Sequence, residues 1–510
     1  MLLIAPPVAK PDAPPAGIAL LAGSLRHHGV PCTLLDANLE GLLFLLDQAE
    51  NPGDTWSSRA LRHRHAHLVA LRSLTLYRNR DRYQRAVRDI NRVLASAVHS
   101  RPELSISLAN YQDSSADPLN SRDLLREAEQ FERSIYTPWF RARLPDLLAS
   151  ENHRLIGISL SFLSQALPTF ALLGYLRSTF PHLILVLGGG LITSWMNSRD
   201  WNDPFAGLVD HCIAGPGENP LLRLFGIDNA CEDPVPDYAD LPLTDYLAPG
   251  PILPYAASQG CYWNRCSFCP EAAEQNRYRP IRPSTALTHL RQLCEQMQPM
   301  LIHLLDNALS PTLLQTLGEH PPGAPWYGFA RVNEQLADPD YCRTLRLSGC
   351  ALLKLGLESG SQHVLDAMNK GIQLDLVIRV LDTLHQAGIA TYVYLLFGTP
   401  SESIDEARQT LAFTLRNHQA ITFLNLAIFN MPRGSKEAVQ VGGTAFSAGD
   451  LSLYRDFIHP RGWDRRAIRT FLDREFTRHP AISSILHRDP PLFTSNHAAF
   501  FSDCFPWPAG

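Results

Sequence analysis

Three cysteines lie within one short stretch near the middle of the chain. Cys261, Cys266 and Cys269 occur in residues 258–270, SQGCYWNRCSFCP, with four residues between the first two and two between the last two. The apolar run 252–257 leads directly into this stretch. Three thiolates on a flexible loop can each bind one iron of a cubane cluster, which leaves the fourth iron without a protein ligand. Such an open iron is a place for substrate chemistry, whereas a fully ligated cluster usually transfers electrons.

The spacing of the three cysteines does not by itself require a cluster. A structural zinc site needs four ligands, and no Cys or His follows at the spacing that zinc modules use. A disulfide would use two of the thiols and leave the third without a partner. Free cysteines are also common in protein cores. The rest of the chain therefore has to decide between a cluster and buried thiols.

Composition and charge narrow the class of protein. A chain of 510 residues predicts two or three domains, and 45% hydrophobic residues are enough for large cores. The net charge of −5 indicates no general attraction to nucleic acid or to an anionic membrane. The ten cysteines show no disulfide-like pattern, which favours a reducing compartment. The N-terminus lacks a basic region and no apolar run is long enough to span a bilayer, so we expect a cytoplasmic protein.

Strands and helices alternate at the start of the chain and again after residue 150. This alternation predicts an α/β domain with a parallel sheet covered by helices on both faces, in a doubly wound, Rossmann-like arrangement. The expected strands are 2–5, 30–35, 155–161, 183–187 and 208–214, and the expected helices are 16–28 and 165–180.

The loops at the carboxyl ends of these strands are candidate ligand contacts, because open α/β sheets bind ligands there. Small residues let a backbone approach a ligand closely, although three glycines after a strand are often only a tight turn. The candidate residues are Asp36, Asn38, Gly41, Ser159, Leu160, Ser161, Gly188, Gly189, Gly190, Gly215, Gly217 and Glu218.

Residues 1–230 are expected to form this first domain, with a mainly helical insertion at about 50–150. The insertion is rich in arginine at its start, and acidic residues follow. We therefore interpret it as a solvated helical surface rather than as an RNA-binding surface. A proline-rich linker is expected in residues 231–250.

A second domain is expected in residues 251–435, followed by a mainly helical C-terminal extension in 436–510. Six strands alternating with helices predict a partial (β/α)6 barrel with its chemistry at the carboxyl ends of the strands. Polar residues follow three of those strands, namely Asp306, Arg331 and Glu358. Taken alone, Glu358 could be a structural carboxylate paired with Lys354 or Lys370. The expected strands are 252–257, 300–305, 326–332, 351–357, 390–397 and 421–429.

The cysteine loop resembles the cluster-binding loop of the radical S-adenosylmethionine (radical SAM) enzymes, which also carries an aromatic residue between its last two cysteines, here Phe268. The usual family spacing is C-x3-C-x2-C, and this chain has one additional residue among 262–265. Residues 356–361 and 368–371 also resemble the fourth strand and helix of that family. The resemblance implies that the three cysteines hold a 4Fe-4S cluster. It further implies that S-adenosylmethionine is bound by Phe268, Asp306, Arg331, Gly356, Glu358 and Ser361.

The first domain resembles the cobalamin-binding domain that precedes many radical SAM domains. That fold carries D-x-H-x-x-G where this chain has Asp36-x-Asn38-x-x-Gly41. The resemblance implies that the candidate loop residues named above contact cobalamin. A neutral amide is a poor cobalt ligand beside imidazole, so we expect cobalamin with no histidine axial ligand. The alternative is a degenerate domain that binds no cofactor.

The resemblance covers residues 1–48 and 150–435 and implies a cobalamin-dependent radical SAM enzyme. The favoured activity is a methyltransferase that transfers a methyl group from S-adenosylmethionine, by way of methylcobalamin, to an unactivated carbon through a 5′-deoxyadenosyl radical. One alternative is a non-methylating rearrangement, ring contraction or cyclisation, and another is a non-catalytic iron–sulfur or cobalamin-binding module. The expected partners are a small-molecule or peptide substrate and an electron donor such as a flavodoxin or ferredoxin, with neither membrane nor nucleic acid. No residue is assigned a direct catalytic role.

Overall fold

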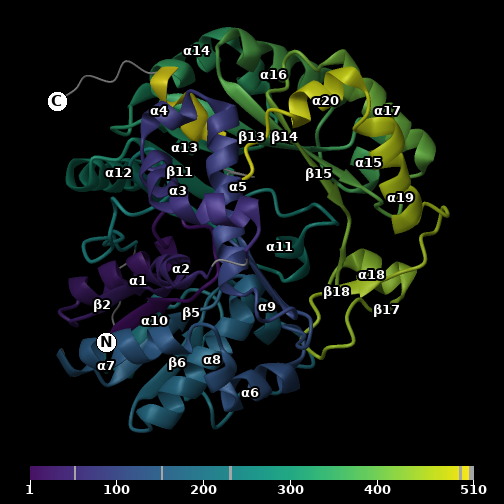
Figure 1. Ribbon diagram of the computed structural model, residues 1–510. Coiled ribbons are helices and arrows are strands. Elements are labelled where there is room, and N and C mark those ends of the chain that lie inside the picture. The colour runs from purple at the N-terminus through teal and green to yellow at the C-terminus, as the bar shows by residue number, and fades with distance from the viewer. Residues whose placement is uncertain (51–52, 151–152, 229–232, 493–496, 505–510) are drawn as a thin grey trace. The chain divides into compact units, whose positions relative to one another are not determined.

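The chain forms two compact units (Figure 1). The computed structural model describes residues 1–50, 53–150, 153–228, 233–492 and 497–504. Unit 1 comprises Met1–Gly250 together with Ser447–Leu453, and unit 2 comprises Pro251–Phe446 together with the chain from Tyr454 onward. Within the described residues, no helix combines the length and the apolar character that a membrane crossing requires.

Unit 1 is built on a five-stranded parallel sheet in the order β2-β1-β5-β6-β7. All four residues of β1 are buried, as expected for a strand covered on both faces. The predicted α/β architecture is confirmed, and the last strand is shorter than expected. The strands are β1 (Leu2–Ala5), β2 (Thr33–Asp36), β5 (Leu155–Ser159), β6 (Ile184–Gly188) and β7 (His211–Cys212). The helices next to them are α1 (Ala16–His27), α2 (Ala37–Gln48), α8 (Leu163–Thr179), α9 (Gly190–Met196) and α10 (Glu218–Leu224).

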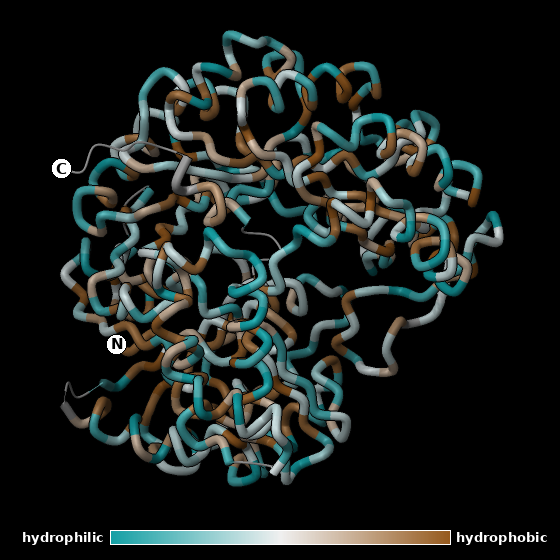
Figure 2. Tube along the Cα trace, turned by 45° about the horizontal axis from the view of Figure 1, so that its top comes forward, coloured by the Kyte–Doolittle hydropathy of each residue, from teal (hydrophilic) through white to brown (hydrophobic). Residues whose placement is uncertain are grey.

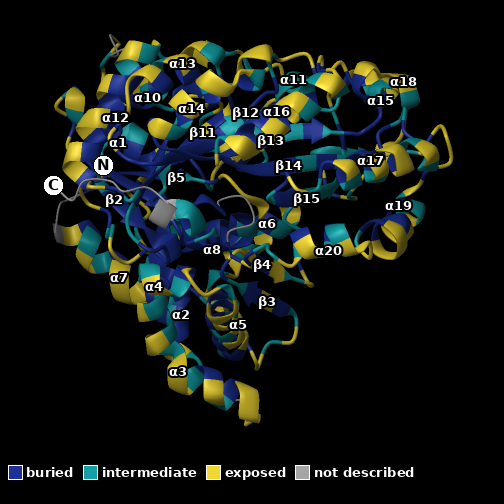
Figure 3. Ribbon diagram, turned by 90° about the horizontal axis from the view of Figure 1, so that it is seen from above, coloured by how far each residue is buried: buried dark blue, intermediate teal, exposed yellow. Residues whose placement is uncertain are grey.

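The insertion between α2 and β5 is mainly helical, as predicted, and also contains a short hairpin. Its longest helix buries one apolar stripe, with Tyr83, Val87, Ile90 and Leu94 fully enclosed. Most of the arginines face solvent, and α3 is exposed along much of its length (Figure 3). The elements are α3 (Thr55–Leu71), α4 (Leu74–Tyr77), α5 (Arg80–Ala97), β3 (Leu104–Ser107), β4 (Asn110–Asp113), α6 (Ser121–Glu129) and α7 (Thr137–Ser150).

The segment expected to link the domains packs into unit 1 from residue 233 onward, and its residues 231–232 lie outside the described part. Tyr246 and Leu247 are buried. Asp240 accepts hydrogen bonds from the Leu34 backbone at 3.0 Å and from the Arg26 guanidinium at 2.5 Å. The proline-rich segment from residue 233 onward is therefore ordered and packs against β2 and α1.

Unit 2 contains a six-stranded, all-parallel sheet whose strands follow one another in sequence order, β8-β11-β12-β13-β14-β15. All six predicted strands are present. Apolar residues gather along the sheets of the molecule, and hydrophilic residues lie mostly on the outer turns of the helices (Figure 2). The strands are β8 (Ile252–Tyr255), β11 (Leu301–Leu309), β12 (Trp326–Ala330), β13 (Cys350–Glu358), β14 (Ala390–Phe397) and β15 (Phe423–Ile428).

The helices of unit 2 connect successive strands, as in a partial barrel. The spacing of Ser403 and Glu406 in the sequence predicts a capping box, and the structure shows it at the first turn of α17. The helices are α12 (Pro283–Met297), α13 (Pro311–Glu319), α14 (Pro339–Leu347), α15 (Gln362–Ala367), α16 (Leu374–Gln386) and α17 (Ile404–Arg416).

The C-terminal extension contains helices, as expected, but also a small antiparallel sheet in the order β16-β18-β17. The sequence predicts helical structure over 463–486, and the structure has α19 and α20 there, with a π-helical turn over Leu472–Phe476 between them. The expected loop 490–497 includes residues 493–496, which lie outside the described residues. The elements are β16 (Met431–Pro432), α18 (Lys436–Val441), β17 (Thr444–Ala445), β18 (Tyr454–Asp456), α19 (Arg465–Phe471) and α20 (Pro480–Leu486).

Candidate active site

The cysteine loop is fixed at both ends by regular structure. The short strand β9 (Ser258–Gln259) pairs with β10 (Arg279–Pro280) just before the first cysteine. Gly260 has a φ of +69°, and a Cβ at this position would lie 2.8 Å from the Arg277 carbonyl oxygen, so only glycine fits. Cys269 is the N-cap residue of helix α11 (Pro270–Ala273). The loop between these anchors carries all three cysteines.

The three thiols belong to one cluster of groups. Cys266 interacts electrostatically with both Cys261 and Cys269. Burial raises the pKa of the Cys266 thiol, although nearby Lys370 and Arg331 partly offset this effect. Burial also raises the pKa of Cys269, to about 11. A metal cluster held by these two thiols would therefore have to displace protons that the protein alone retains at neutral pH.

The cysteine loop borders a cavity. Among the described residues, no three His, Cys, Asp or Glu side chains are arranged to hold one metal ion. A cubane instead binds each thiolate to a different iron. Cys266 and Ser267 line a cavity of about 760 Å³. The Ser267 hydroxyl is buried without a hydrogen-bond partner in the described part of the chain, which leaves a donor for a bound group.

Arg331, directly after β12, joins the cysteine loop to the turn that follows α15. Its guanidinium lies 4.3 Å from the centroid of the Trp263 ring and 3.9 Å from the Cys266 sulfur, and it donates a 2.5 Å hydrogen bond to the Lys370 carbonyl. Trp263 Nε1 donates to the Asn369 carbonyl at 3.1 Å. A Cβ on Gly371 would lie 2.1 Å from the Trp263 ring. The part of the loop that has one additional residue is therefore packed against residues 369–371.

A buried ion pair stands at the end of β13. Glu358 and Lys370 are 2.7 Å apart, and their side chains are 12% and 8% exposed. The Lys370 ammonium also lies 5.5 Å from the centroid of the Phe268 ring. A Cβ on Gly356 would lie 2.5 Å from Glu358 Oε1 and 2.9 Å from Lys370 Nζ, so glycine makes room for the pair. Glu358 thus has the lysine partner that was the structural alternative for it.

Two other candidate residues are bonded within the protein. Asp306, in β11, accepts hydrogen bonds from the Ala257 backbone at 3.0 Å and from the Ser258 hydroxyl at 2.5 Å. It therefore holds the start of the cysteine loop, and burial raises its pKa. Ser361 is buried, and its backbone N–H donates to the Ser359 hydroxyl at 3.1 Å. Phe268, Arg331, Gly356 and Glu358 form one group, whereas Asp306 and Ser361 support its edges.

In unit 1, the loop after β2 is held by two buried side chains. Asp36 caps α2 through a 2.9 Å bond from the Leu39 N–H and accepts a 2.7 Å bond from the Tyr246 hydroxyl. Burial raises the pKa of Asp36 to about 6. Asn38 Oδ1 accepts a 2.8 Å bond from the Ala9 N–H. The amide of Asn38 is therefore engaged with the loop that follows β1.

The glycine turn after β6 lies against the loop after β5. The Leu160 N–H donates to the Gly188 carbonyl at 2.8 Å. Gly189 has a φ of +105°, and a Cβ there would lie 2.4 Å from the Leu160 carbonyl oxygen. A Cβ on Gly190 would meet only the Ser161 carbonyl oxygen, at 3.9 Å. The turn is therefore packed against Leu160 at Gly189 and has free space at Gly190, so its backbone is accessible to a ligand on that side.

The remaining candidate residues of unit 1 extend this surface. Ser159 ends β5, and the Ser161 N–H donates to Gln165 Oε1 at 3.0 Å. The Gly215 N–H donates to Thr193 Oγ1 at 2.9 Å, and a Cβ on Gly215 would meet nothing within 4 Å. Gly217 is the N-cap of α10 and Glu218 is its first residue. A Cβ on Gly41 would lie 3.1 Å from the Tyr136 ring, so Gly41 serves packing within unit 1.

Several connecting residues were not predicted. Gln165 bonds both the Ser161 loop and the Pro6 carbonyl, the latter at 2.7 Å, so the loop after β1 belongs to the same edge of the sheet. Trp263 and Lys370 join the cysteine loop to the end of β13 in the same way. Gln165 and Trp263 were not predicted in any role, whereas Lys370 was named only as a possible structural partner of Glu358. The prolines after the first strand are a sequence signal that could have drawn attention to the loop after β1.

The sequence matches known proteins over part of its length. Residues 326–414 match the radical SAM superfamily. An uncharacterised methyltransferase of Pyrococcus horikoshii is 25% identical over 195 residues, which are 37% of this chain and 42% of that protein. Bacteriochlorophyllide d C-12(1)-methyltransferase of Chlorobaculum tepidum is 28% identical over 176 residues, 32% of this chain and 38% of that protein. The matches span less than half the length of either relative.

Two solved structures share the fold over a larger part of the chain. The radical S-adenosylmethionine methyltransferase TsrM of Kitasatospora setae, with cobalamin and a [4Fe-4S] cluster bound, has a TM-score of 0.52 at 15% identity and covers 91% of this chain and 84% of its own. The cobalamin-dependent S-adenosylmethionine radical enzyme OxsB, with aqua-cobalamin and S-adenosylmethionine bound, has a TM-score of 0.52 at 16% identity and covers 65% and 60%. At these identities the likeness concerns the fold. Residues 326–414 therefore match the radical SAM superfamily, and the chain shares its fold with these two cobalamin-dependent enzymes.

Proposed function

We propose that this protein is a cobalamin-dependent radical SAM enzyme that transfers a methyl group from S-adenosylmethionine to an unactivated carbon. The observation that carries the proposal is the packing of the three-cysteine loop against the Glu358–Lys370 pair and Arg331 at the strand ends of unit 2. The names of the two curated relatives, both methyltransferases, support methyl transfer over the other chemistries of the class.

Each cofactor has residues in this chain that would hold it. Cys261, Cys266 and Cys269 would hold a 4Fe-4S cluster, and the group around Glu358 would bind S-adenosylmethionine. The backbone at Gly188–Gly190 and Gly215 would receive cobalamin. When bound, these groups supply a substrate radical and a methyl group for it.

The protein's own residues position these groups and set local charge. Arg331 and Lys370 place positive charge beside the Cys266 thiolate, which stabilises its deprotonated form. Glu358 balances Lys370, so the group around Cys266 carries little excess charge. Asn38 offers no imidazole at the position where the related fold carries histidine, so we propose that no histidine ligates cobalt. A one-electron donor such as a flavodoxin or ferredoxin, and a small-molecule or peptide substrate, complete the proposal.

The test is anaerobic incubation of the reconstituted full-length protein with a reductant and S-adenosylmethionine labelled on its methyl group. We expect 5′-deoxyadenosine and S-adenosylhomocysteine, with label recovered in the cobalamin fraction. Formation of 5′-deoxyadenosine without any transfer of label would favour a rearrangement or cyclisation instead. If neither product forms although the cluster is present, the protein is a binding module.

A further inference from the structure

A second cavity of unit 2, of about 490 Å³, lies at the carboxyl ends of β14 and β15. Its walls are Gly398 and Phe429–Asn430 at those strand ends, together with Phe446 and residues 455–459, 462–466 and 468 of the C-terminal extension. Cavities that bind small organic molecules commonly enclose about 300 to 1,000 Å³. The cavity is therefore of a suitable size for one small ligand.

The apolar wall of this cavity is aromatic and continues toward the cysteine loop. Phe429 and Phe457 both line it, with ring centroids 6.0 Å apart. Phe429 belongs to a buried apolar cluster against which Phe268 and Phe457 pack. Because Phe268 lies between the last two cysteines of the loop, the aromatic wall and the cysteine loop share one apolar cluster. A ligand on this wall would be near the proposed reactive centre.

The polar wall carries three arginines, Arg455, Arg465 and Arg466. Arg465 is held in place, because its Nη1 donates to the Phe429 carbonyl at 3.1 Å and to Asn430 Oδ1 at 2.7 Å, and its guanidinium lies 5.3 Å from the Phe446 ring centroid. Within the described part of the chain, none of the three forms a salt bridge, whereas arginines elsewhere, such as Arg177 and Arg408, are paired with carboxylates. The cavity therefore presents cations that the protein itself does not neutralise by direct pairing.

The two acidic residues of the lining are already engaged. Asp464 caps α19 through a 2.7 Å bond from the Ala467 N–H. Asp456 is exposed and accepts a 3.0 Å bond from the Phe457 N–H. Two carboxylates against three guanidinium groups leave the lining with excess positive charge, which favours an anionic ligand.

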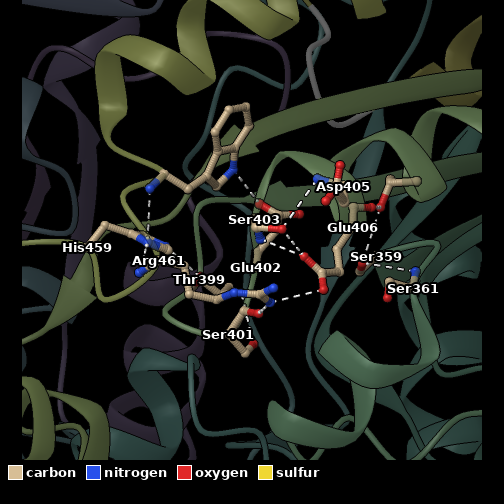
Figure 4. A network of polar contacts seen from close by, with 12 residues as sticks. Ser359, Ser361, Thr399, Ser401, Glu402, Ser403, Asp405, Glu406, His459 and Arg461 are labelled. Atoms are coloured by element: carbon tan, nitrogen blue, oxygen red, sulfur yellow. Dashed lines mark hydrogen bonds and ion pairs between the residues drawn. The ribbon is translucent and has the colours of Figure 1, made fainter.

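The segment that forms one side of the cavity is fixed by a hydrogen-bonded network (Figure 4). His459 Nε2 lies 2.9 Å from the Thr399 carbonyl oxygen, and Trp463 Nε1 donates to Glu402 Oε2 at 3.1 Å. The same oxygen accepts a 2.5 Å bond from the Gly398 N–H. Residues 459–463 are therefore tied to the loop after β14, and the cavity has a preorganised wall.

We propose that this cavity binds the substrate, and that the substrate is an organic anion with a flat apolar body. The apolar body would lie against Phe429, Phe457 and Trp463, and its carboxylate or phosphate would face the three arginines. The identification of the ligand as the substrate rests on the proposed function. The preference of the cavity for an organic anion does not depend on that function.

The experiment measures binding to the reconstituted full-length protein by isothermal titration calorimetry. Its three probes share a naphthalene ring and differ in the polar group at position 2. These are naphthalene-2-carboxylate, 2-naphthyl phosphate and the neutral 2-naphthamide. We expect at least one anion to bind about tenfold more tightly than the amide, because a charged group forms the stronger hydrogen bonds to arginine. The anion that binds more tightly assigns the ligand as a carboxylate or as a phosphate ester.

Two variants and a control locate the site. Arg455→Gln and Arg466→Gln should each weaken binding of the preferred anion by about three- to tenfold. Arg474→Gln removes an exposed arginine outside the cavity and should leave binding unchanged. The proposal would be overturned if the amide bound as tightly as the anions. It would also be overturned if both cavity variants bound the preferred anion as tightly as the parent protein does. These binding measurements do not depend on cleavage of S-adenosylmethionine. Failure of this proposal can therefore be distinguished from failure of the proposed function.

Discussion

The two parallel sheets of this protein end in different kinds of surface. In unit 1 the strand ends offer mainly backbone, with glycines at 188–190 and 215, and the buried Asp36 has a pKa raised to about 6 and is bonded to Tyr246. In unit 2 the strand ends offer charged side chains, with Glu358, Lys370 and Arg331 close to one another and to the cysteine loop.

This difference teaches what each unit can recognise. A backbone surface with small residues admits a large ligand at close range but supplies little charge. A buried group of charged side chains selects a small, polar ligand and responds strongly to the loss of one partner. The two units should therefore differ in how they respond to substitution: unit 1 to added volume, and unit 2 to altered charge or lost ligands.

The largest expected effect is the loss of a cysteine from the loop. Cys266→Ala should reduce bound iron from about four per chain to the background level, because a cubane without one of its thiolates is not retained. Iron and sulfide analysis after anaerobic reconstitution measures this. Cys294→Ala removes a buried thiol from α12 and should keep the iron. A Cys266→Ala protein with its full iron content would refute the cluster assignment.

The next effect concerns the buried ion pair. Glu358→Gln alone leaves Lys370 as an uncompensated buried cation and should lower the free energy of unfolding by about 3–5 kcal/mol. The double variant Glu358→Gln/Lys370→Met should lose less than the single variant. Urea denaturation of four proteins measures the coupling: the parent, the single variants Glu358→Gln and Lys370→Met, and the double variant. Additive losses in the double variant would mean that the two side chains act independently.

In unit 1 the expected effect depends on volume. Gly189→Ala would place a Cβ 2.4 Å from the Leu160 carbonyl oxygen at a φ of +105°. We expect a displaced turn and a cobalamin stoichiometry well below that of the parent protein, measured by absorbance after gel filtration. Gly207→Ala is the matched control, since its φ is +90° and nothing lies within 4 Å of the added Cβ. That control should cost about 1–2 kcal/mol of backbone strain and retain cobalamin. Equal cobalamin content in both variants would contradict the role of the glycine turn.

The smallest effect concerns Glu402, whose pKa is raised to about 7 by burial. In the folded state it binds a proton more tightly than in the unfolded state, so stability falls as pH rises from about 4.5 to about 7. Glu402→Gln cannot titrate but keeps an oxygen acceptor for Gly398 and Trp463. The stability of the variant relative to the parent should therefore increase over this range, by about 1–3 kcal/mol. Thermal denaturation at several pH values measures the difference, and parallel profiles would show that Glu402 does not titrate there.

Much of the fold could be predicted because hydrophobic runs and turn residues are local signals. Both parallel sheets and the capping box at Ser403 follow from patterns of this kind. The packing of residues 233–250 onto unit 1 could not be read in the same way, because it depends on distant pairs such as Tyr246 with Asp36. A proline-rich composition favours extended backbone whether or not that backbone is covered.

The candidate site likewise combines residues found from local sequence signals with residues whose roles depend on long-range contacts. Cys261, Cys266 and Cys269 stand out by their spacing, which on its own left buried thiols as an alternative to a cluster. The role of Trp263 cannot be predicted in this way, because it arises from contacts between a loop and a turn more than 100 positions apart in sequence, including the 3.1 Å bond from Trp263 to Asn369. Whether Glu358 is paired also depended on which of two lysines folds back toward it.

The short segment 447–453 makes unit 1 discontinuous in sequence. The Leu451 N–H donates to the Leu119 carbonyl at 2.9 Å, and Asp450 accepts a 2.8 Å bond from the Ser121 N–H. During synthesis, unit 1 cannot be completed until residue 453 has emerged, and by then residues 251–446 of unit 2 already exist. Vectorial folding, in which an N-terminal domain finishes before the next begins, is therefore not open to this chain. The gene also has no single position at which it can be divided into two parts that each encode one whole unit.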